Sequence, residues 1–355
     1  MQWDSLLGHQ QQKQWFQTAL DSGRLASSFL FIGPEGIGKR TFATLLAKGL
    51  LCRNSPTQSL DACGHCEDCV QVDAGTHPDL LSVAKPADKA NIPIELLIGE
   101  REKRMRAGLC HDISMRPYGG RRKIAIVDDA DTFNNEGANC LLKTLEEPPS
   151  DSVLILLGTS LQRQLPTIRS RCQAILFKPL DVEQLQTLLL RTELTDSAGR
   201  AFQLASQASG SLAEARLLVD PELDEFRGHL LENLGKPQLP LIELAKSCGA
   251  IVDAAGKDAR VKRERLKLIF RIAASFYREL SLNLSVASPE RASQRGENEL
   301  SQAVEVCRKH WKTGSRGATQ AWDRCLLATE QVNRNANQAT LLEAWAADIA
   351  RLGGM

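Results

Sequence analysis

Short apolar runs alternate with helix-length amphipathic segments over the first half of the chain. Residues 29–32, 124–127 and 153–157 are continuous apolar runs with the length of buried strands, and a similar run follows at 174–177. Between the second and third runs, apolar residues recur every three or four positions over 138–145. Strands that alternate with helices are typical of a parallel α/β sheet, so we expect this fold class here.

The pattern changes after Pro179, where helical periodicity replaces the alternation of strands and helices. Helices are expected at 181–193 and 196–207, and the remainder reads as wholly helical, with a long helix at 254–280 and a polar loop at 285–298. We therefore predict three domains: an α/β domain at 1–178, a small helical domain at 179–221 and a larger helical domain at 222–355.

The composition is that of an ordinary soluble globular protein, with 43% hydrophobic and 25% charged residues in a chain of 355. A net charge of +1 indicates no overall basic excess, so any nucleic-acid contact must come from a local patch. The N-terminus lacks a signal-peptide pattern and no apolar run has membrane-spanning length, which predicts a cytoplasmic location. Two basic clusters, at 101–106 and 116–123, can contact phosphates or lie on solvated surfaces.

A glycine-rich turn joins the first apolar run to a helical segment. Gly33, Gly36 and Gly38 lie in a loop that fits the pattern G-x-x-x-x-G-K-[ST] as far as Lys39. Glycines let backbone N–H groups point at phosphate oxygens, and the start of the following helix adds its positive dipole end. The segment predicts a phosphate site that binds ATP or ADP through Lys39, although the loop can also persist only for its shape.

The metal chemistry of this phosphate site is altered. Arg40 stands where a Ser or Thr hydroxyl would coordinate Mg²⁺, and Thr41 lies about 100° further round the helix. Asp128 follows the second apolar run and is placed to help to hold Mg²⁺. Asp129 occupies the position at which a glutamate would polarise the attacking water, with a side chain one methylene shorter. We therefore expect doubtful Mg²⁺ binding and weak or absent ATP hydrolysis.

Two further segments can contribute to the same edge of the sheet. Thr159 follows the third apolar run, where its hydroxyl can sense a γ-phosphate or simply end the strand. Residues 1–28 contain a helical pattern with Trp15 and Phe16, which can pack against a nucleotide base or form a core helix.

Four of the ten cysteines are clustered after the phosphate-loop helix, at Cys52, Cys63, Cys66 and Cys69. Two overlapping C-x-x-C pairs and one upstream cysteine suit tetrahedral Zn²⁺, with bonds of about 2.3 Å. Four protein ligands would close the site, so its role would be structural, and it would hold the loop 53–62. His65 is expected to be a bystander, and the alternative is four free thiols.

Together these motifs resemble the clamp-loader branch of the AAA+ ATPases. The resemblance rests on the cysteine insertion, on Leu141–Pro149 (LLKTLEEPP), which is close to a helix signature of the family, and on Ser170-Arg171-Cys172, which matches the family's arginine-finger motif. The segment Asn333–Asn337 is similar to the start of the last collar helix. The match covers 1–220 well and the helical remainder loosely.

The resemblance implies a subunit of a heteropentameric loader that opens the ring-shaped sliding clamp and places it on primed DNA. Its partners would be the gamma/tau and delta subunits of the DNA polymerase III clamp loader, the sliding clamp and primer-template DNA. Residues 179–221 would be the lid and 222–355 the collar. Arg171 would act in trans on the ATP of a neighbour, with Arg169 as the local competitor for that role.

The departures from the family pattern favour a subunit that does not turn over ATP. Arg40, Asp129 and Ala213 replace the hydroxyl, the glutamate and the lid arginine of motor subunits, whereas Arg171 is retained. An active gamma/tau-type ATPase that tolerates these changes is one alternative, and a AAA+ repair or recombination ATPase is another. The Leu141–Pro149 signature and the four cysteines argue against the last.

Overall fold

The computed structural model describes residues 2–56, 59–86, 89–119, 121–285 and 299–354. They form two compact units, Met1–Arg216 and Leu217–Met355, which are treated separately below. The expected polar loop at 285–298 lies, after its first residue, outside the described residues. Within the described ranges, none of the helices combines the length and the apolar character that crossing a membrane requires.

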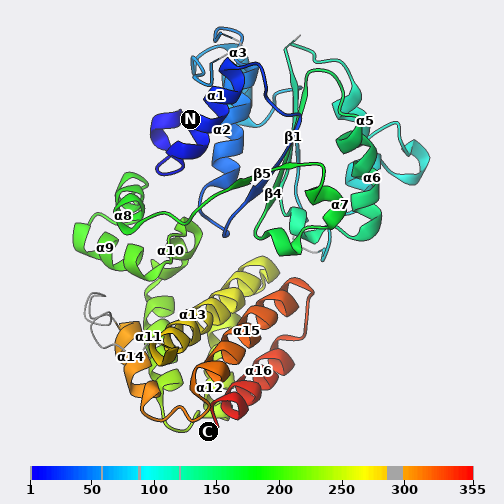
Figure 1. Cartoon of the computed structure of the whole chain (residues 1–355). Helices are drawn as coiled ribbons and strands as arrows, with labels where there is room; N and C mark the ends of the chain where they lie inside the picture. The colour runs from blue at the N-terminus through cyan, green and yellow to red at the C-terminus, as the bar shows by residue number, and fades with distance from the viewer. Residues whose placement is uncertain (1, 57–58, 87–88, 120, 286–298, 355) are drawn as a thin grey trace. The chain divides into compact units, whose positions relative to one another are not determined.

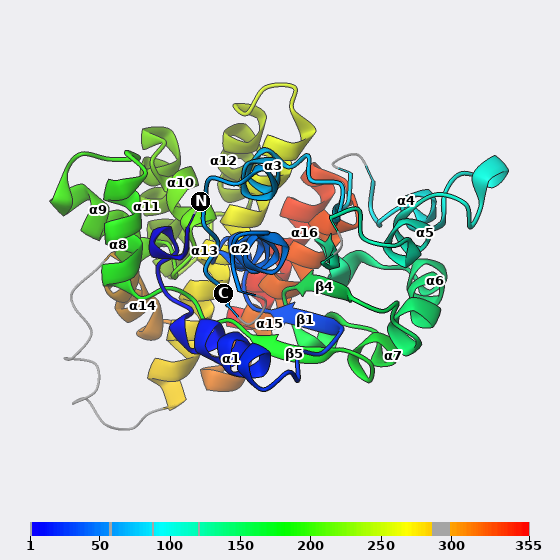
Figure 2. The ribbon, with the colours of Figure 1, turned by 90° about the horizontal axis from the view of Figure 1, so that it is seen from above.

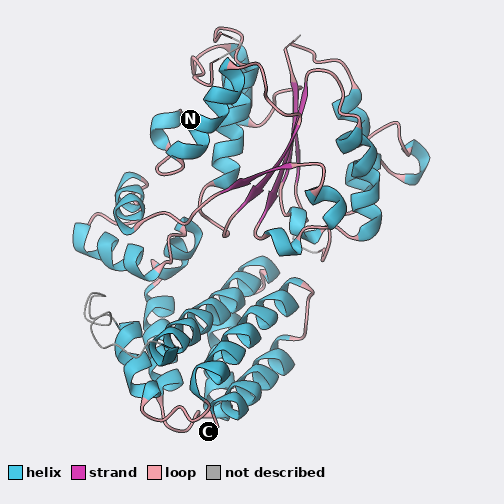
Figure 3. Cartoon of the chain, in the orientation of Figure 1, coloured by secondary structure: helices cyan, strands magenta, loops and turns pink. Residues whose placement is uncertain are grey.

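The first unit is built on five parallel strands, as the apolar runs predict (Figures 1 and 3). In spatial order these are β2 (Leu80–Val83), β3 (Lys123–Val127), β4 (Ser152–Gly158), β1 (Ser28–Ile32) and β5 (Gln173–Leu176). In β1, β3 and β4 every residue is buried, which explains their unbroken apolar sequences. The confirmed fold class is therefore a parallel α/β sheet.

Helices cover both faces of this sheet (Figures 1 and 2). One face packs against α1 (Gln10–Asp21) and α2 (Lys39–Leu51), and α3 (Glu67–Ala74) lies against α2. The other face is covered by four helices: α4 (Ile94–Ile98), α5 (Leu109–Ser114), α6 (Asn135–Glu146) and α7 (Pro166–Arg169). The described residues of this unit also form four 3-10 turns: η1 (Trp3–Ser5), η2 (Arg101–Lys103), η3 (Ala130–Thr132) and η4 (Leu161–Arg163).

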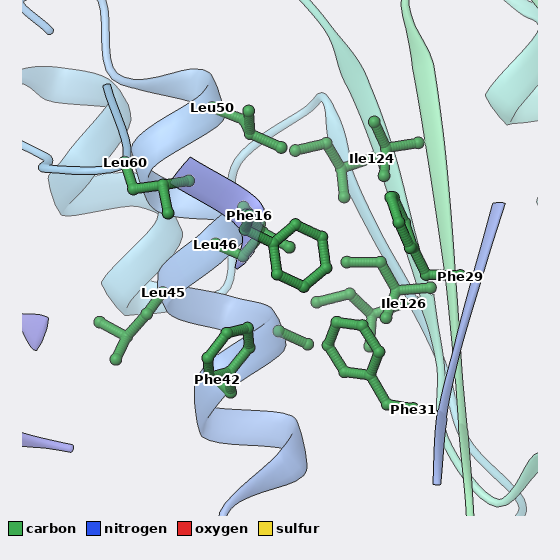
Figure 4. Close-up of a cluster of buried hydrophobic side chains, with 14 of the residues drawn as sticks. Phe16, Phe29, Phe31, Phe42, Leu45, Leu46, Leu50, Leu60, Ile124 and Ile126 are labelled. Atoms are coloured by element: carbon green, nitrogen blue, oxygen red, sulfur yellow. The ribbon is translucent and has the colours of Figure 1, made fainter. Parts of the chain in front are cut away.

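Successive residues of each central strand point to opposite faces, so one strand supplies two cores. In β1, Phe29 and Phe31 pack against α1 and α2, whereas Leu30 faces the other layer. Phe16 of α1 meets Phe29 edge-on, with ring centroids 4.9 Å apart (Figure 4). This aromatic cluster fixes the positions of β1 and α2, and the glycine-rich loop joins these two elements.

Strand β2 was not predicted from the sequence. Its run Leu80–Val83 is only four residues long and contains Ser82, and its side chains are partly exposed. It pairs with β3 at the edge of the sheet, with Leu80 opposite Ile124. A short, half-exposed edge strand lacks the continuous apolar signal of a central strand, which is why the sequence pattern did not reveal it.

Three helices follow the sheet: α8 (Val182–Arg191), α9 (Ala198–Gln207) and α10 (Leu212–Leu218). The first two lie within the helical segments predicted at 181–193 and 196–207. Asp181 begins α8 with a capping box, in which its carboxylate accepts the backbone N–H of Gln184.

In the described residues of the second unit, all regular secondary structure is helical (Figure 3). It consists of α11 (Pro221–Gly235), α12 (Leu241–Asp253), α13 (Ala259–Ser285), α14 (Glu299–Arg308), α15 (Gly314–Asn333) and α16 (Gln338–Gly353). Trp345 is fully buried against Phe270, with ring centroids 5.3 Å apart.

The long helix predicted at 254–280 is wrong at both ends, because α13 spans Ala259–Ser285. Gly256 adopts a φ of +75° and ends the preceding helical turn. The carboxylate of Asp258 then accepts the backbone N–H of Arg260 at 2.8 Å and caps the new helix.

The close approach of α2 to the cysteine-containing loop gives a stability prediction. A Cβ placed on Gly49 would lie 2.2 Å from the carbonyl oxygen of Leu60. Gly49→Ala should therefore lower the free energy of unfolding by about 1–3 kcal/mol, as overpacking does, despite the better helix propensity of alanine. Gly199→Ala is the control, since the nearest atom lies 3.9 Å away. Urea unfolding followed by circular dichroism measures both, and equal effects would contradict this packing.

Candidate functional site

The glycine-rich loop lies at the carboxyl edge of the sheet. The chain leaves β1 at Ile32 and enters α2 at Lys39. Gly36 and Gly38 have φ values of +74° and +101°, a region that residues with a Cβ rarely adopt. Gly33 passes so close to the chain leaving β5 that a Cβ would lie 2.4 Å from the carbonyl oxygen of Phe177. These three glycines therefore have conformational and packing reasons to be there.

Lys39 turns back into this loop. Its Nζ donates to the carbonyl oxygens of Gly33 and Pro34, both at 2.6 Å. Burial lowers the pKa of Lys39, and four surrounding carboxylates act in the opposite direction. A phosphate group that enters the loop would have to replace these two carbonyls as the partner of the ammonium group.

Arg40 forms an ion pair with the carboxylate that would otherwise help to hold Mg²⁺. Its Nη1 lies 2.9 Å from Oδ2 of Asp128, and its Nη2 donates to Oγ of Ser82 at 3.1 Å. The other oxygen of Asp128 accepts the backbone N–H of Asp129 at 3.1 Å. Mg²⁺ requires near-octahedral oxygen ligands, whereas here a guanidinium neutralises the carboxylate. The residues present do not fit a magnesium site.

The other expected catalytic and sensing residues also bond within their own chain or face solvent. The side chain of Thr159 and its backbone N–H both donate to Oδ2 of Asp131, at 2.6 Å each. Oδ1 of Asp131 accepts a short hydrogen bond from Gln164. Asp129 is exposed and has a φ of +55°, and Thr41 is half-buried in the first turn of α2.

The segment between α9 and α10 is bonded directly to the glycine-rich loop. Oγ of Ser211 donates to the carbonyl of Glu35 at 2.9 Å, and the N–H of Leu212 donates to the carbonyl of Gly36 at 3.0 Å. A Cβ on Gly36 would lie 2.5 Å from Cβ of Ala213. The segment between α9 and α10 and the glycine-rich loop are therefore packed together within this unit.

The N-terminal segment covers the start of α2 from another side. Nε2–H of His9 donates to the carbonyl of Ile37 at 2.7 Å, and its ring meets Phe177 edge-on with centroids 5.0 Å apart. Burial lowers the pKa of His9. Phe16 of the following helix is a fully buried core residue. Residues 1–28 thus supply a core helix and, ahead of it, a segment that contacts the loop.

Arg171 lies at the opposite edge of the sheet. It lies two residues before β5, whose first residue Gln173 is in register with Phe29 of β1. The glycine-rich loop follows the last residue of β1, so the strand length alone separates the two by about 13 Å at roughly 3.3 Å per residue. Arg171 consequently lies at the edge of the sheet away from the phosphate loop of its own chain.

The guanidinium of Arg171 is held in place by local partners. Its Nε and Nη2 donate to Oε1 of Glu146 at 2.9 and 2.5 Å. Nη1 donates to the carbonyl of Thr167 at 3.0 Å and to Oγ of Ser170 at 3.1 Å. By contrast, the competing Arg169 is exposed, and its side chain has no hydrogen bond or ion pair in the described part of the chain.

The four clustered cysteines form a candidate metal site. Their Sγ atoms all lie within 4.8 Å of one another, with 3.8 Å between Cys52 and Cys66 and 3.9 Å between Cys63 and Cys69. A tetrahedron of sulfur atoms at 2.3 Å from a zinc ion has edges of about 3.8 Å. The donor atoms and their spacing therefore fit a four-coordinate metal ion.

The surroundings of Cys63 favour its thiolate, whereas burial raises the pKa of the Cys69 thiol. The backbone N–H groups of Cys63 and Cys66 donate to Sγ of Cys52 and Cys63, both at 3.4 Å. The N–H groups of His65 and Cys66 lower the pKa of the Cys63 thiol to about 6. The ring of His65 is exposed and hydrogen-bonds to the carbonyl of Cys63, so it lies outside the four-cysteine set.

The loop that carries the cysteines is stabilised by an ion pair and by the hydrogen bonds of a second arginine. Arg53 bonds both carboxylate oxygens of Asp68 at 2.7 Å, which lowers the pKa of Asp68 to about 2. Arg121, from one of the basic clusters, donates to the carbonyls of Arg53 and Ser55 at 3.2 and 2.8 Å. The side chain of Arg121 therefore holds the backbone of the cysteine loop in place.

Residues 8–181 match the family described as DNA polymerase III, delta subunit. The delta' subunit of DNA polymerase III from Pseudomonas aeruginosa is 34% identical over 247 residues, which cover 68% of this chain and 71% of that protein. The chain belongs to the AAA+ clamp-loader family.

Other family members share the same region. The tau subunit of DNA polymerase III from Salmonella typhimurium is 32% identical over 246 residues, which cover 67% of this chain but only 36% of that longer protein. A solved structure of a DNA polymerase III gamma subunit-related protein from Thermotoga maritima covers 95% of this chain and 99% of its own at 18% identity, with a TM-score of 0.38.

Several residues of the site were missed by sequence reasoning. Ser82 lies on the unrecognised strand β2, and Ser211 belongs to the Gly-Ser pair before Ala213, which did not show that it bonds Glu35. Glu146 belongs to the Leu141–Pro149 signature and Asp131 lies just after Asp129, but the sequence alone did not show that they bond Arg171 and Thr159. Each of these partners is remote in sequence from the residue that it contacts, and only folding brings the two together.

The cysteine cluster gives a prediction about metal content. The purified chain should hold close to one metal ion, measured by elemental analysis after gel filtration, because four thiolates pre-arranged in a tetrahedron bind tightly. Cys66→Ser should lose the ion and lower the midpoint of thermal unfolding. Cys140→Ser, which alters a cysteine outside the cluster, should retain it. A folded wild-type chain without metal would refute the site.

Proposed function

We propose that this chain is a delta-prime-like subunit of the DNA polymerase III clamp loader, with little or no ATP hydrolysis of its own. It would help to open the sliding clamp and to load it on primed DNA. The observation that carries the proposal is the ion pair between Arg40 and Asp128. The 34% identity to the Pseudomonas aeruginosa delta' subunit supports the same choice.

The ion pair between Arg40 and Asp128 occupies the carboxylate that would position Mg²⁺ for hydrolysis. In P-loop ATPases a hydroxyl and an aspartate position Mg²⁺, which neutralises charge on the transferred phosphate. Here the guanidinium of Arg40 supplies positive charge to Asp128, but it cannot bridge phosphate oxygens as an octahedral metal does. Any ATP or ADP would be held by Lys39, by the N–H groups of the loop and by the start of α2, with little dependence on Mg²⁺.

The contact between the lid and the loop supports a rigid role. Ser211 and Leu212 bond the loop backbone, and Ala213 stands where a motor subunit carries a lid arginine. A lid that is already packed on the loop leaves little room for an opening and closing cycle driven by nucleotide. The chain would therefore act as a fixed member of the heteropentameric ring.

Arg171 would supply an arginine finger in trans. It is permanently charged and lies at the sheet edge opposite its own phosphate loop, so only the nucleotide of a neighbouring subunit can meet it. Its neighbours would be gamma/tau and delta subunits, joined through a collar formed by the second unit. The four cysteines would hold structural Zn²⁺, and sliding clamp and primer-template DNA would be further partners of the assembled loader.

One alternative is an active gamma/tau-type ATPase. It is favoured by the retained Lys39, by the intact glycine-rich loop and by the 32% identity to a tau subunit. It would require Arg40 to leave Asp128 so that Mg²⁺ could enter. Nucleotide binding by the isolated chain separates the two proposals, because binding does not need a neighbour's arginine.

Restoring the missing hydroxyl should restore metal dependence. For the wild-type chain we expect weak ATP binding that changes less than about threefold between Mg²⁺ and EDTA, since Arg40 already neutralises Asp128. For Arg40→Ser, Mg²⁺ should strengthen binding by about tenfold or more. Isothermal titration calorimetry measures both, with Arg24→Ser as a surface control. Tight, Mg²⁺-dependent binding by the wild type would instead support the motor alternative.

Removing the finger should slow the reconstituted loader. Arg171→Ala should reduce clamp- and DNA-dependent ATP turnover several-fold, because the served site loses on the order of 10³-fold in rate. Assembly, followed by gel filtration, should be unchanged. Arg169→Ala is the matched control and should turn over ATP as the wild type does. Equal turnover by Arg171→Ala and wild type would count against a finger in trans.

A further inference from the structure

Glu146 accounts for two of the four hydrogen bonds that hold the guanidinium of Arg171. Its Oε1 accepts from both Nε and Nη2, at 2.9 and 2.5 Å. We propose that Glu146 is a positioning residue that orients Arg171 for the nucleotide of the neighbouring subunit. This inference rests on the proposed role of Arg171 as a finger in trans.

The hydrogen bonds fix the plane of the guanidinium and still leave a donor for phosphate. Glu146 takes Nε–H and one N–H of Nη2, while Thr167 and Ser170 take Nη1. A guanidinium has five N–H donors, so the second N–H of Nη2 remains available. The guanidinium of Arg171 is therefore fixed in orientation, and one N–H of its Nη2 remains free to donate to a phosphate.

Two rigid helix ends set the position of this pair. Glu146 is the last residue of α6, which is anchored by the buried Leu141 and Leu145 and stopped by Pro148. Arg171 follows α7, whose Ile168 is buried in the same core. Both side chains thus start from packed backbone, and a functional group supported in this way is more sharply placed than one on a free loop.

The location of Glu146 is unfavourable for its own helix. A carboxylate at a helix C-terminus opposes the helix dipole, so stability alone does not explain an acid at this position. Side-chain exposures of 31% for Arg171 and 49% for Glu146 mean that water screens the pair. The consequence of the contact is therefore mainly orientation, since a long flexible arginine is ordered before the partner arrives.

The test uses the reconstituted loader with Glu146→Ala and the matched control Glu147→Ala. Glu147 is the adjacent, exposed acid, and its side chain has no hydrogen bond or ion pair among the described residues. We expect Glu146→Ala to lower the kcat of clamp- and DNA-dependent ATP turnover by about twofold, less than Arg171→Ala does, with KM unchanged, and Glu147→Ala to have no effect. Glu146→Gln keeps the acceptor oxygen and should restore part of the loss.

A second measurement reports on the contact without any partner. Modification of Arg171 by phenylglyoxal in the isolated chain, followed by mass spectrometry, should be several-fold faster in Glu146→Ala than in the wild type or in Glu147→Ala, because ion pairing shields the guanidinium. An unchanged rate would show that Glu146 does not hold Arg171 and would overturn the proposal.

The outcomes separate this inference from the function on which it rests. If Arg171→Ala itself leaves turnover unchanged, the finger in trans fails and the positioning role fails with it. If Arg171→Ala slows turnover but Glu146→Ala matches or exceeds the wild type, the finger stands and the positioning role is overturned. A double variant that is no slower than Arg171→Ala alone is the further result that the proposal requires.

Discussion

The direction of the parallel sheet is the constraint on which the rest of the first unit depends. All carboxyl ends lie at one edge, so the loops after β1, β3 and β4 bring Gly33–Lys39, Asp128 and Thr159 together. The amino ends lie at the other edge, and there Arg171 meets Glu146. One chain therefore presents a phosphate loop at one edge and, at the other, a guanidinium that Glu146 holds in place.

At the phosphate edge the polar groups are largely satisfied within the chain. Lys39 bonds loop carbonyls, Arg40 bonds Asp128, and Thr159 bonds Asp131. Buried or half-buried charges are stable only when they are paired or hydrogen-bonded, and this edge achieves that without a ligand. At the opposite edge Arg171 is also held, but by contacts that leave an N–H donor for another molecule.

The cysteine module depends both on the spacing of its cysteines in the sequence and on tertiary contacts that hold its loop. The end of α2 supplies one thiol, and the loop and α3 supply the others. Gly49 lets this loop lie directly on α2, and Arg121 ties its backbone to the rest of the unit. The cysteine module thus continues directly from α2, the helix that starts at the phosphate loop. A well-ordered cysteine module therefore helps to fix the position of α2.

The sequence by itself determined the parallel sheet, the glycine-rich loop and the tetrad of cysteines, because each depends on residue types at short, regular spacing. It also showed that Arg40 replaces a metal-binding hydroxyl. Only the tertiary structure decided what Arg40 binds, because Asp128 is 88 residues away in sequence, and the same holds for Arg171 and Glu146. Side-chain partners across such separations depend on strand order and helix packing, which local periodicity does not encode.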